Sequence, residues 1–151
     1  MLANYEIRPY EPDDFYATNF GDSCEMLTGM PEKTIAEFYG KQGPAFSGFA
    51  DGEIIACAGV FIKWPGTGES WCRITPKVFE HKRFFFVQSG RYLDLIAKQK
   101  NLQRIEANVQ ASNERALKFV DHLGFKCEGP KLKYFNGETF FGYAKFYGGE
   151  E

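Results

Sequence analysis

The sequence predicts one domain over residues 1–151, of the α+β (α/β) class, with a mixed, mostly antiparallel sheet of about seven strands flanked by helices. Two hairpin signals, Asp51-Gly52 and Asn136-Gly137, lie between runs of apolar and alternating residues. A strand, a helix and a second strand follow one another over residues 104–129. Hairpins combined with a strand-helix-strand segment indicate a mixed sheet that carries helices on its faces.

The N-terminal part is expected to form a strand and two helices. Tyr5–Tyr10 alternates and then meets a turn, and Glu11–Tyr16 carries acidic residues where a helix N-terminus favours them. A second helix is expected to begin near Pro31, a favourable first-turn residue, and residues 22–29 are expected to form a short helix and a turn. The apolar residues expected on the buried side of the second helix are Ile35, Ala36 and Phe38.

The central part predicts three consecutive strands. Residues 45–50 and 54–62 flank Asp51-Gly52, and a strand at Trp71–Thr75 is ended by Pro76. The turn at residues 64–68 contains a Gly-x-Gly sequence that could contact phosphate. We interpret it as a hairpin turn, because no helix follows it as a phosphate site requires.

The C-terminal part predicts two helices, a strand between them and a final hairpin. Residues 82–100 have a helical pattern, and Ile105–Gln110 reads as a strand. Asn113–Leu123 reads as an amphipathic helix, capped by Ser112 or Asn113 and ended by Gly124. Strands at 131–135 and 139–146 flank the type I′ turn. The expected buried face of the first helix comprises Phe85, Ser89, Tyr92 and Ile96, widened by Phe86, Leu93 and Leu95.

Composition favours a globular protein that does not bind nucleic acid. The chain is 44% hydrophobic and 25% charged, with a net charge of −2 that lacks the basic excess of nucleic-acid-binding proteins. The 16 Phe residues predict a Phe-rich core rather than an aromatic binding surface. No apolar run is long enough to span a membrane, the N-terminus does not resemble a signal peptide, and the four cysteines lack metal-site spacing. We therefore expect a cytoplasmic protein with no metal site.

Residues 104–129 resemble the C-terminal half of the GCN5-related N-acetyltransferase (GNAT) superfamily. The resemblance rests on Asn113-x-x-Ala116 and on Leu123-Gly124-Phe125-x-x-Glu128-Gly129, and Ile74-Thr75-Pro76 matches the family's Val-x-Pro. It implies a GNAT-like fold and transfer of acetyl from acetyl-coenzyme A to a primary amine. The general base implied on the fourth strand is Glu69, with water as the alternative.

The resemblance also implies a set of cofactor-binding residues. Backbone groups of Cys72 and Ile74 would bond the pantetheine arm, which Asn113 would also reach, although capping of its own helix explains Asn113 equally well. Ala116 and Phe119 would line the cofactor cleft. His81, Lys82 and Arg83 would attract the pyrophosphate as point charges, or form a solvated basic helix start.

Two departures from the family leave activity open. The stretch Lys77–Phe84 contains no Gly, whereas the family places a Gly-rich phosphate loop there. Val120 occupies the position of the usual Tyr general acid and cannot donate a proton. Both departures resemble GNAT-like proteins of tailed bacteriophages, including the T7-type internal virion protein group.

Two functions remain open on the sequence. The chain is either an acetyl-CoA-dependent N-acetyltransferase or a catalytically degenerate protein of the same fold that acts in a phage virion or on a host partner. Acetyl-CoA binding would be weak or lost without the Gly-rich loop. The acceptor amine and any protein partner are not identified by the sequence, and the location would be the host cytoplasm or the virion.

Overall fold

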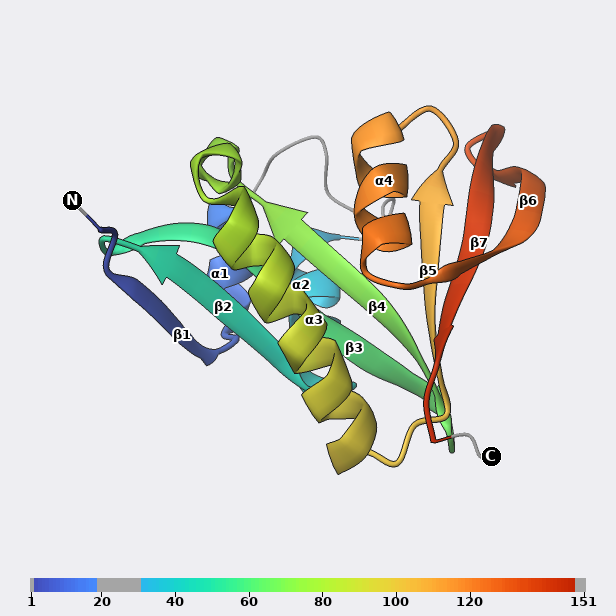
Figure 1. Ribbon diagram of the computed structural model, residues 1–151, viewed down its shortest axis with the longest axis horizontal. Coiled ribbons are helices and arrows are strands. Elements are labelled where there is room, and N and C mark those ends of the chain that lie inside the picture. Colours follow the sequence, from blue (N-terminus) through green and yellow to red (C-terminus); the bar gives the residue numbers. More distant parts are fainter. Residues whose placement is uncertain (1, 19–30, 149–151) are drawn as a thin grey trace. The chain divides into compact units, whose positions relative to one another are not determined.

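The computed structural model describes residues 2–18 and 31–148, so the segment expected at residues 22–29 lies outside the described residues. Within them, seven strands and four α-helices follow in the predicted order (Figure 1). Hydrogen bonding gives one mixed sheet in the order β1-β2-β3-β4-β5-β7-β6. The expected fold class is confirmed. The chain divides into two compact units, Met1–Phe61 with Trp71–Phe85 and Ile62–Ser70 with Phe86–Glu151; the single-domain organisation stays a prediction.

The first unit contains an antiparallel arrangement of β1 (Tyr5–Pro9), β2 (Ala45–Ala50) and most of β3 (Glu53–Trp64). The turn between β2 and β3 has φ 51° at Asp51 and φ 82° at Gly52. The predicted hairpin is present. Positive φ at both central residues makes its turn type I′, whose twist matches that of the strands it joins.

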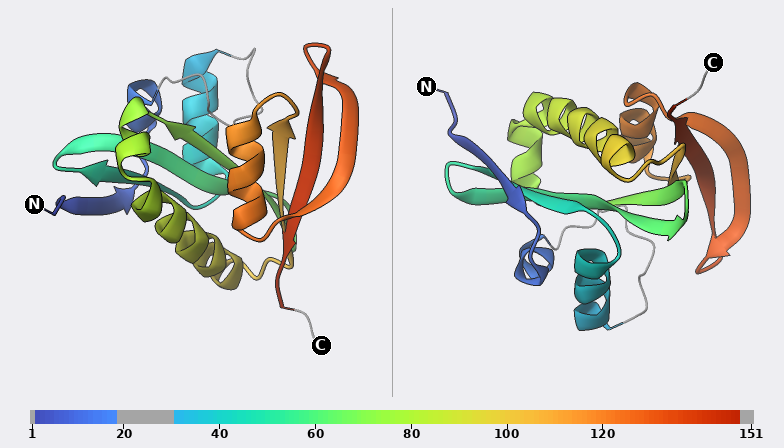
Figure 2. Two further views of the ribbon diagram at one scale, coloured as in Figure 1. Left: turned by 45° about the horizontal axis from the view of Figure 1, so that its top comes forward. Right: turned by 90° about the horizontal axis from the view of Figure 1, so that it is seen from below.

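Helices α1 (Pro12–Ala17) and α2 (Glu32–Lys41) contact each other and lie on the same face of these strands (Figure 2). Pro31 is the N-cap of α2 rather than its first helical residue. The ring of Tyr39 stacks on that of Trp71 at a centroid distance of 3.8 Å, and Phe38 is only partly buried. Buried residues of this cluster are Tyr10, Phe15, Ile35, Ala36, Tyr39, Cys57 and Trp71.

A second cluster of the first unit is formed with the segment that follows β4 (Thr67–Ile74). This segment is a 3₁₀ helix, η1 (Pro76–Glu80), which the sequence did not predict. Helix α3 (Lys82–Gln99) follows it, and Phe84 and Phe85 at its start pack on the cluster. The buried members are Ala50, Ile55, Ala56, Ile74 and Val78.

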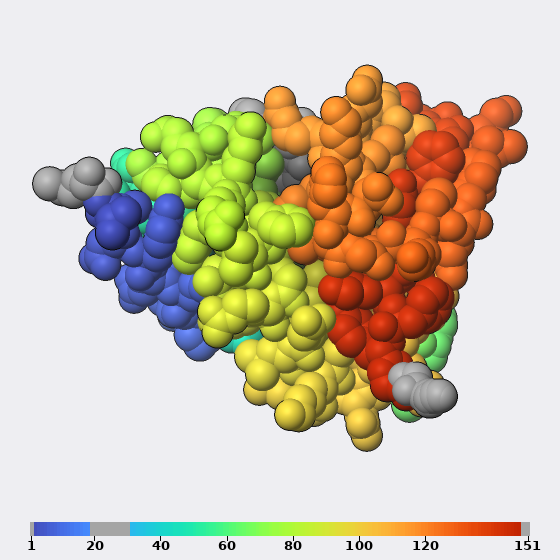
Figure 3. All heavy atoms as spheres, in the orientation of Figure 1, coloured from blue at the N-terminus to red at the C-terminus, as the bar shows by residue number. Residues whose placement is uncertain are grey.

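The second unit contains the start of β4, β5 (Arg104–Gln110), β6 (Lys126–Phe135) and β7 (Glu138–Phe146). Strand β4 begins at Thr67, four residues before the predicted start, because the turn comprises only Pro65 and Gly66. Helix α4 (Glu114–His122) contacts β5, and α4 and β6 form adjoining orange surfaces in Figure 3. The β6–β7 turn is again type I′, with φ 55° at Asn136 and 77° at Gly137.

The predicted buried face of α3 was too wide. Leu93, Ile96 and Ala97 are buried, whereas Leu95 is 42% exposed and Phe86 is 38% exposed. At 100° per residue Leu95 lies on the opposite side of the helix from Ala97, outside the buried arc. Phe86 stays at the surface and contacts the ring of Phe119 edge-on at 6.3 Å.

A buried carboxylate fastens α1 to the strands of the first unit. Asp14 accepts hydrogen bonds from both terminal nitrogens of Arg8, each at 2.9 Å, and from Ser47 Oγ at 2.7 Å. It also accepts from the backbone N–H of Glu11 at 2.9 Å. Burial acts to raise the pKa of Asp14, but these hydrogen bonds outweigh it and leave the pKa lowered.

Replacing this carboxylate is expected to destabilise the protein. Asp14→Ala leaves the donors of Arg8, Ser47 and Glu11 without their acceptor, so the free energy of unfolding should fall by about 3 kcal/mol. Urea denaturation measures the change. Asp13→Ala, at an exposed neighbouring position of the same helix turn, is the control and should cost about 0.5 kcal/mol. Equal losses in the two variants would contradict the role given to Asp14.

Candidate active site

The pairing of β4 with β5 places two carboxylates side by side in the second unit. The strands are parallel, with Thr67 opposite Arg104 and Glu69 opposite Glu106. Opposed residues project from the same face of a sheet, and both side chains are largely buried, at 6% and 16% exposure. Two neighbouring carboxylates repel each other when both are ionised, so this arrangement needs nearby cations.

Lys63 and Arg104 supply those cations. Lys63 Nζ lies 2.7 Å from Glu106 Oε1 and 3.4 Å from Glu69 Oε1. Arg104 Nε donates to Glu106 Oε2 at 2.7 Å, and its terminal nitrogens donate to both oxygens of Glu128. Both carboxylate oxygens of Glu106 therefore accept hydrogen bonds, one from Lys63 and one from Arg104. Of the contacts made by these two cations, Glu69 has only the longer one, with Lys63.

The electrostatics of the cluster follow from these contacts. Burial acts to raise the pKa of Glu106, but the hydrogen bonds from Lys63 and Arg104 outweigh it and lower the pKa below its ordinary value. Burial likewise acts to lower the pKa of Lys63, and the hydrogen bond with Glu106 and the charge of Glu69 raise it overall. Both partners of the Lys63–Glu106 pair are thus held in their charged forms at neutral pH.

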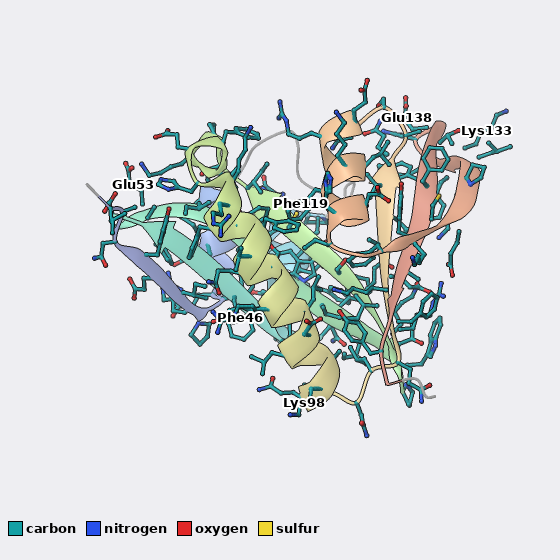
Figure 4. All side chains as sticks on the ribbon, viewed as in Figure 1. Phe46, Glu53, Lys98, Phe119, Lys133 and Glu138 are labelled. Atoms are coloured by element: carbon teal, nitrogen blue, oxygen red, sulfur yellow. The ribbon has the colours of Figure 1, made fainter. Side chains whose placement is uncertain are left out.

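A tyrosine from β6 faces the same cluster. Burial raises the pKa of Tyr134, and the charges of Glu69 and Glu106 raise it further against the opposing effect of Lys63. Its phenol is therefore protonated at neutral pH and lies close enough to Glu69 to respond to that charge. Tyr134 follows Lys133 on β6, and Figure 4 labels Lys133 and Glu138 on the two strands of this hairpin.

The two residues expected to offer backbone groups to pantetheine lie in the first unit. Cys72 and Ile74 occupy the last part of β4, beyond Glu69, where its register with β5 ends. Cys72 is a free, half-buried cysteine. Ile74 is 7% exposed and packs in the cluster that contains Val78.

The segment expected to bind phosphate forms a 3₁₀ helix that is followed by a side-chain contact of His81. The 3₁₀ helix η1 ends at Glu80, and His81 follows as its C-cap. The His81 Nδ1 atom lies 2.7 Å from the hydroxyl of Tyr5, and the Tyr5 ring stacks on Phe84. Lys82 and Arg83 are exposed in the first turn of α3. Lys82 and Arg83 therefore differ from His81, which contacts Tyr5.

The remaining expected cofactor residues lie together on α4 in the second unit. Asn113 is the N-cap, and its Oδ1 accepts from the backbone N–H of Ala116 at 3.1 Å. Capping therefore accounts for one polar atom of Asn113, as the alternative interpretation stated. Ala116 is buried, and Phe119, labelled in Figure 4, is half-buried beside Phe86.

The structure adds Lys63 and Glu106 to the residues that the sequence singled out. The signal for Glu106 was present in the sequence, because Glu106, Asn108 and Gln110 alternate with apolar residues along one strand. Lys63 could not be found in this way, since its contact with Glu106 depends on the strand order.

Solved structures share this architecture. The ribosomal-protein-S18-alanine N-acetyltransferase from Escherichia coli superimposes with a TM-score of 0.75 at 18% identity over 97% of both chains. A spermidine N-acetyltransferase chimera that includes Vibrio cholerae sequence gives 0.74 at 17% identity, over 94% of this chain and 95% of that one. A GNAT-family acetyltransferase from Bacillus anthracis gives 0.71 at 18% identity over 96% of both. The chain has the GNAT fold.

Sequence comparison adds nothing to the structural likeness. No protein-family model matches the chain, and no curated protein is similar to it in sequence. Among residues 2–18 and 31–148, no helix is long and apolar enough to cross a membrane, and no group of His, Cys, Asp and Glu is placed to hold a metal ion. At identities below one fifth, the likeness shows the fold alone.

The lowered pKa of Glu106 predicts a pH dependence of stability. A carboxylate whose pKa is lower in the folded state stabilises the protein above its ordinary pKa of 4.5 and loses that contribution as pH falls through the folded value. Glu106→Gln removes this titration, so its stability should fall less steeply below pH 4.5 than that of the wild type. Glu37→Gln, an exposed change on α2, should keep the wild-type slope. Identical slopes for wild type and Glu106→Gln, measured by urea denaturation across pH, would contradict the proposed ion pairs.

Proposed function

We propose that the chain is an acyl-CoA-dependent N-acetyltransferase that moves acetyl from acetyl-CoA to a primary amine. The observation that carries the proposal is the pairing of Glu69 with Glu106 on β4 and β5. It leaves the Glu69 carboxylate on a face of the sheet with only a 3.4 Å contact to Lys63 among the ion pairs of this cluster. The names of similar structures describe acetylation of spermidine and of protein alanine, both of which are amines.

Glu69 is the proposed general base, with water as the alternative. Glu106 has both oxygens occupied by Lys63 and Arg104, whereas Glu69 meets Lys63 only at 3.4 Å and keeps acceptor capacity. The amine loses a proton to Glu69 and attacks the thioester carbonyl, forming the C–N bond. The C–S bond then breaks and the thiolate leaves as coenzyme A. A backbone N–H of the strand around Ile74 would stabilise the oxyanion.

The proposed cofactor contacts are divided between backbone and side chains. Backbone groups of Cys72 and Ile74 bind the amides of pantetheine, since a strand beyond the end of its ladder can hydrogen-bond an extended arm. In the second unit, Asn113, Ala116 and Phe119 are the residues proposed to contact the cofactor.

The phosphate contacts fit acetyl-CoA only in part. The first turn of α3 offers its dipole and the charges of Lys82 and Arg83, while His81 is engaged by Tyr5. Without a Gly in residues 77–84, backbone N–H groups are shielded by side chains. Each charge-assisted hydrogen bond that the phosphates cannot form weakens binding by about 1.5–3 kcal/mol, so we expect low affinity. The departing thiolate is protonated by water, because Val120 replaces the usual acid.

The activity is tested by thiol release from acetyl-CoA in the presence of an amine panel. The wild type should release coenzyme A at a rate that depends on the amine, and Glu69→Gln should lower the rate about 100-fold, the usual size of a general-base contribution. Glu37→Gln, exposed on α2, is the matched control and should keep the wild-type rate. Amine-independent release, or no release with any amine at millimolar acetyl-CoA, would exclude the proposal.

One observation favours a second candidate function. The 3₁₀ helix η1 and the Tyr5–His81 contact occupy the segment that would otherwise form a Gly-rich phosphate loop. This favours a catalytically degenerate GNAT-fold protein, for which the sequence resemblance implies a role in a bacteriophage virion or on a host partner. Absence of both acetyl-CoA binding and thiol release would support this candidate over the enzyme.

A further inference from the structure

One buried amide of the second unit lacks a partner for its nitrogen. Asn108 on β5 is 4% exposed, and within the described residues its Nδ2 has no hydrogen bond. Its Oδ1 accepts from Lys131 Nζ at 2.7 Å. Because an ammonium group only donates, the amide oxygen must face Lys131, which fixes the orientation of the amide. The donor group of Asn108 is therefore held ready for an acceptor that the described chain does not provide.

The amide belongs to the face that carries the carboxylates. Asn108 follows Glu106 by two residues, so both project from the same side of β5. On the neighbouring strand β7, Gly142 lies opposite Asn108 and Ala144 lies opposite Glu106. These small residues leave room above β7. A Cβ added at Gly142 would lie 3.0 Å from Lys131 Cε, so the absence of a side chain lets Lys131 cross β7.

An irregularity in β6 supplies the residues that cross to this face. The β6–β7 register shifts between Lys131 and Phe135, and Lys133 within the shift has φ 50°. A bulge of this kind re-aims neighbouring side chains, and a non-glycine residue at positive φ is held there by its surroundings. The irregular segment delivers Lys131 to Asn108, and the Tyr134 ring lies beside the same lysine, with its centroid 4.8 Å from Lys131 Nζ.

The charges and hydrogen-bonding groups of this face define the chemistry of an acceptor. Lys63, Arg104 and Lys131 accompany Glu69, Glu106 and Glu128, and Glu138 adds a further carboxylate through its hydrogen bond with Gln110. A protonated polyamine has no oxygen to accept a hydrogen bond from Asn108. An amine that carries a carbonyl oxygen on the adjacent carbon satisfies both Glu69 and Asn108.

We propose that the acceptor is an α-amino carbonyl compound, such as a peptide N-terminus or an amino-acid amide. Its oxygen accepts a hydrogen bond from Asn108 Nδ2 while its amine faces Glu69, and Lys131 is a positioning residue that holds Asn108. This inference rests on the proposed acetyltransferase function and names its substrate class.

The test compares two amines that differ only in the group to be recognised. L-alaninamide carries a carboxamide where isopropylamine carries a methyl group. With rates corrected for the unprotonated fraction of each amine, the wild type should prefer L-alaninamide in kcat/KM by about ten- to a hundredfold. Asn108→Leu should lose most of this preference, so that its kcat/KM for L-alaninamide falls to near its own value for isopropylamine. A short peptide that begins with alanine separates peptide acceptors from free amides, and spermidine should be a poor substrate.

The controls separate failure of this inference from failure of the proposed function. Lys131→Met, at an exposed residue, should reduce the preference for L-alaninamide mainly through a higher KM, because the amide of Asn108 is no longer fixed. The wild-type preference is informative even if Asn108→Leu does not fold. Equal use of isopropylamine or spermidine by the wild type would overturn the inference and leave the acetyltransferase intact. No acetylation of any amine would overturn both.

Discussion

The parallel pairing of β4 with β5 is the constraint on which the second unit depends. It extends over Thr67–Glu69 and Arg104–Glu106, and it ends with two carboxylates opposite each other. Such a pair is unfavourable unless cations compensate it, because neighbouring ionised carboxylates repel. The position of Lys63 near the end of β3 and of Arg104 at the start of β5 follows from this requirement.

Backbone hydrogen bonds from the start of β5 to the turn before β4 reinforce the β4–β5 pairing. The carbonyl oxygen of Gly66, in the turn that leads into β4, accepts from the N–H groups of Gln103 and Arg104 at 2.8 and 3.1 Å. The turn thereby sets the register at which β5 begins, and Ser70 Oγ donates to the carbonyl of Glu106 at 3.0 Å. Backbone contacts fix where the carboxylates lie, and of the two, Glu106 is bonded on both oxygens whereas Glu69 meets Lys63 at 3.4 Å.

Local chemistry made the element order predictable, whereas long-range contacts set most of the site. Asp51-Gly52 and Asn136-Gly137 specify type I′ turns by themselves, because both positions require positive φ. The exposure of Leu95 and the helix η1 depend on which segments pack nearby, and a hydrophobic pattern does not carry that information. Glu69 was singled out because the resemblance implies a carboxylate near the fourth strand, and its role stays a prediction. Its contact with Lys63 and the bridge from Lys131 to Asn108 depend on register and could not be predicted.

Calorimetric titration of the wild-type protein with acetyl-CoA tests the central claim most directly, because every proposed step requires the cofactor to bind. The account predicts saturable binding with a dissociation constant between the micromolar and millimolar ranges, weakened by the missing Gly-rich loop and retained through β4, α4 and the first turn of α3. No saturable heat at millimolar acetyl-CoA would contradict it, and the GNAT fold of this chain would then serve a function other than acetyl transfer.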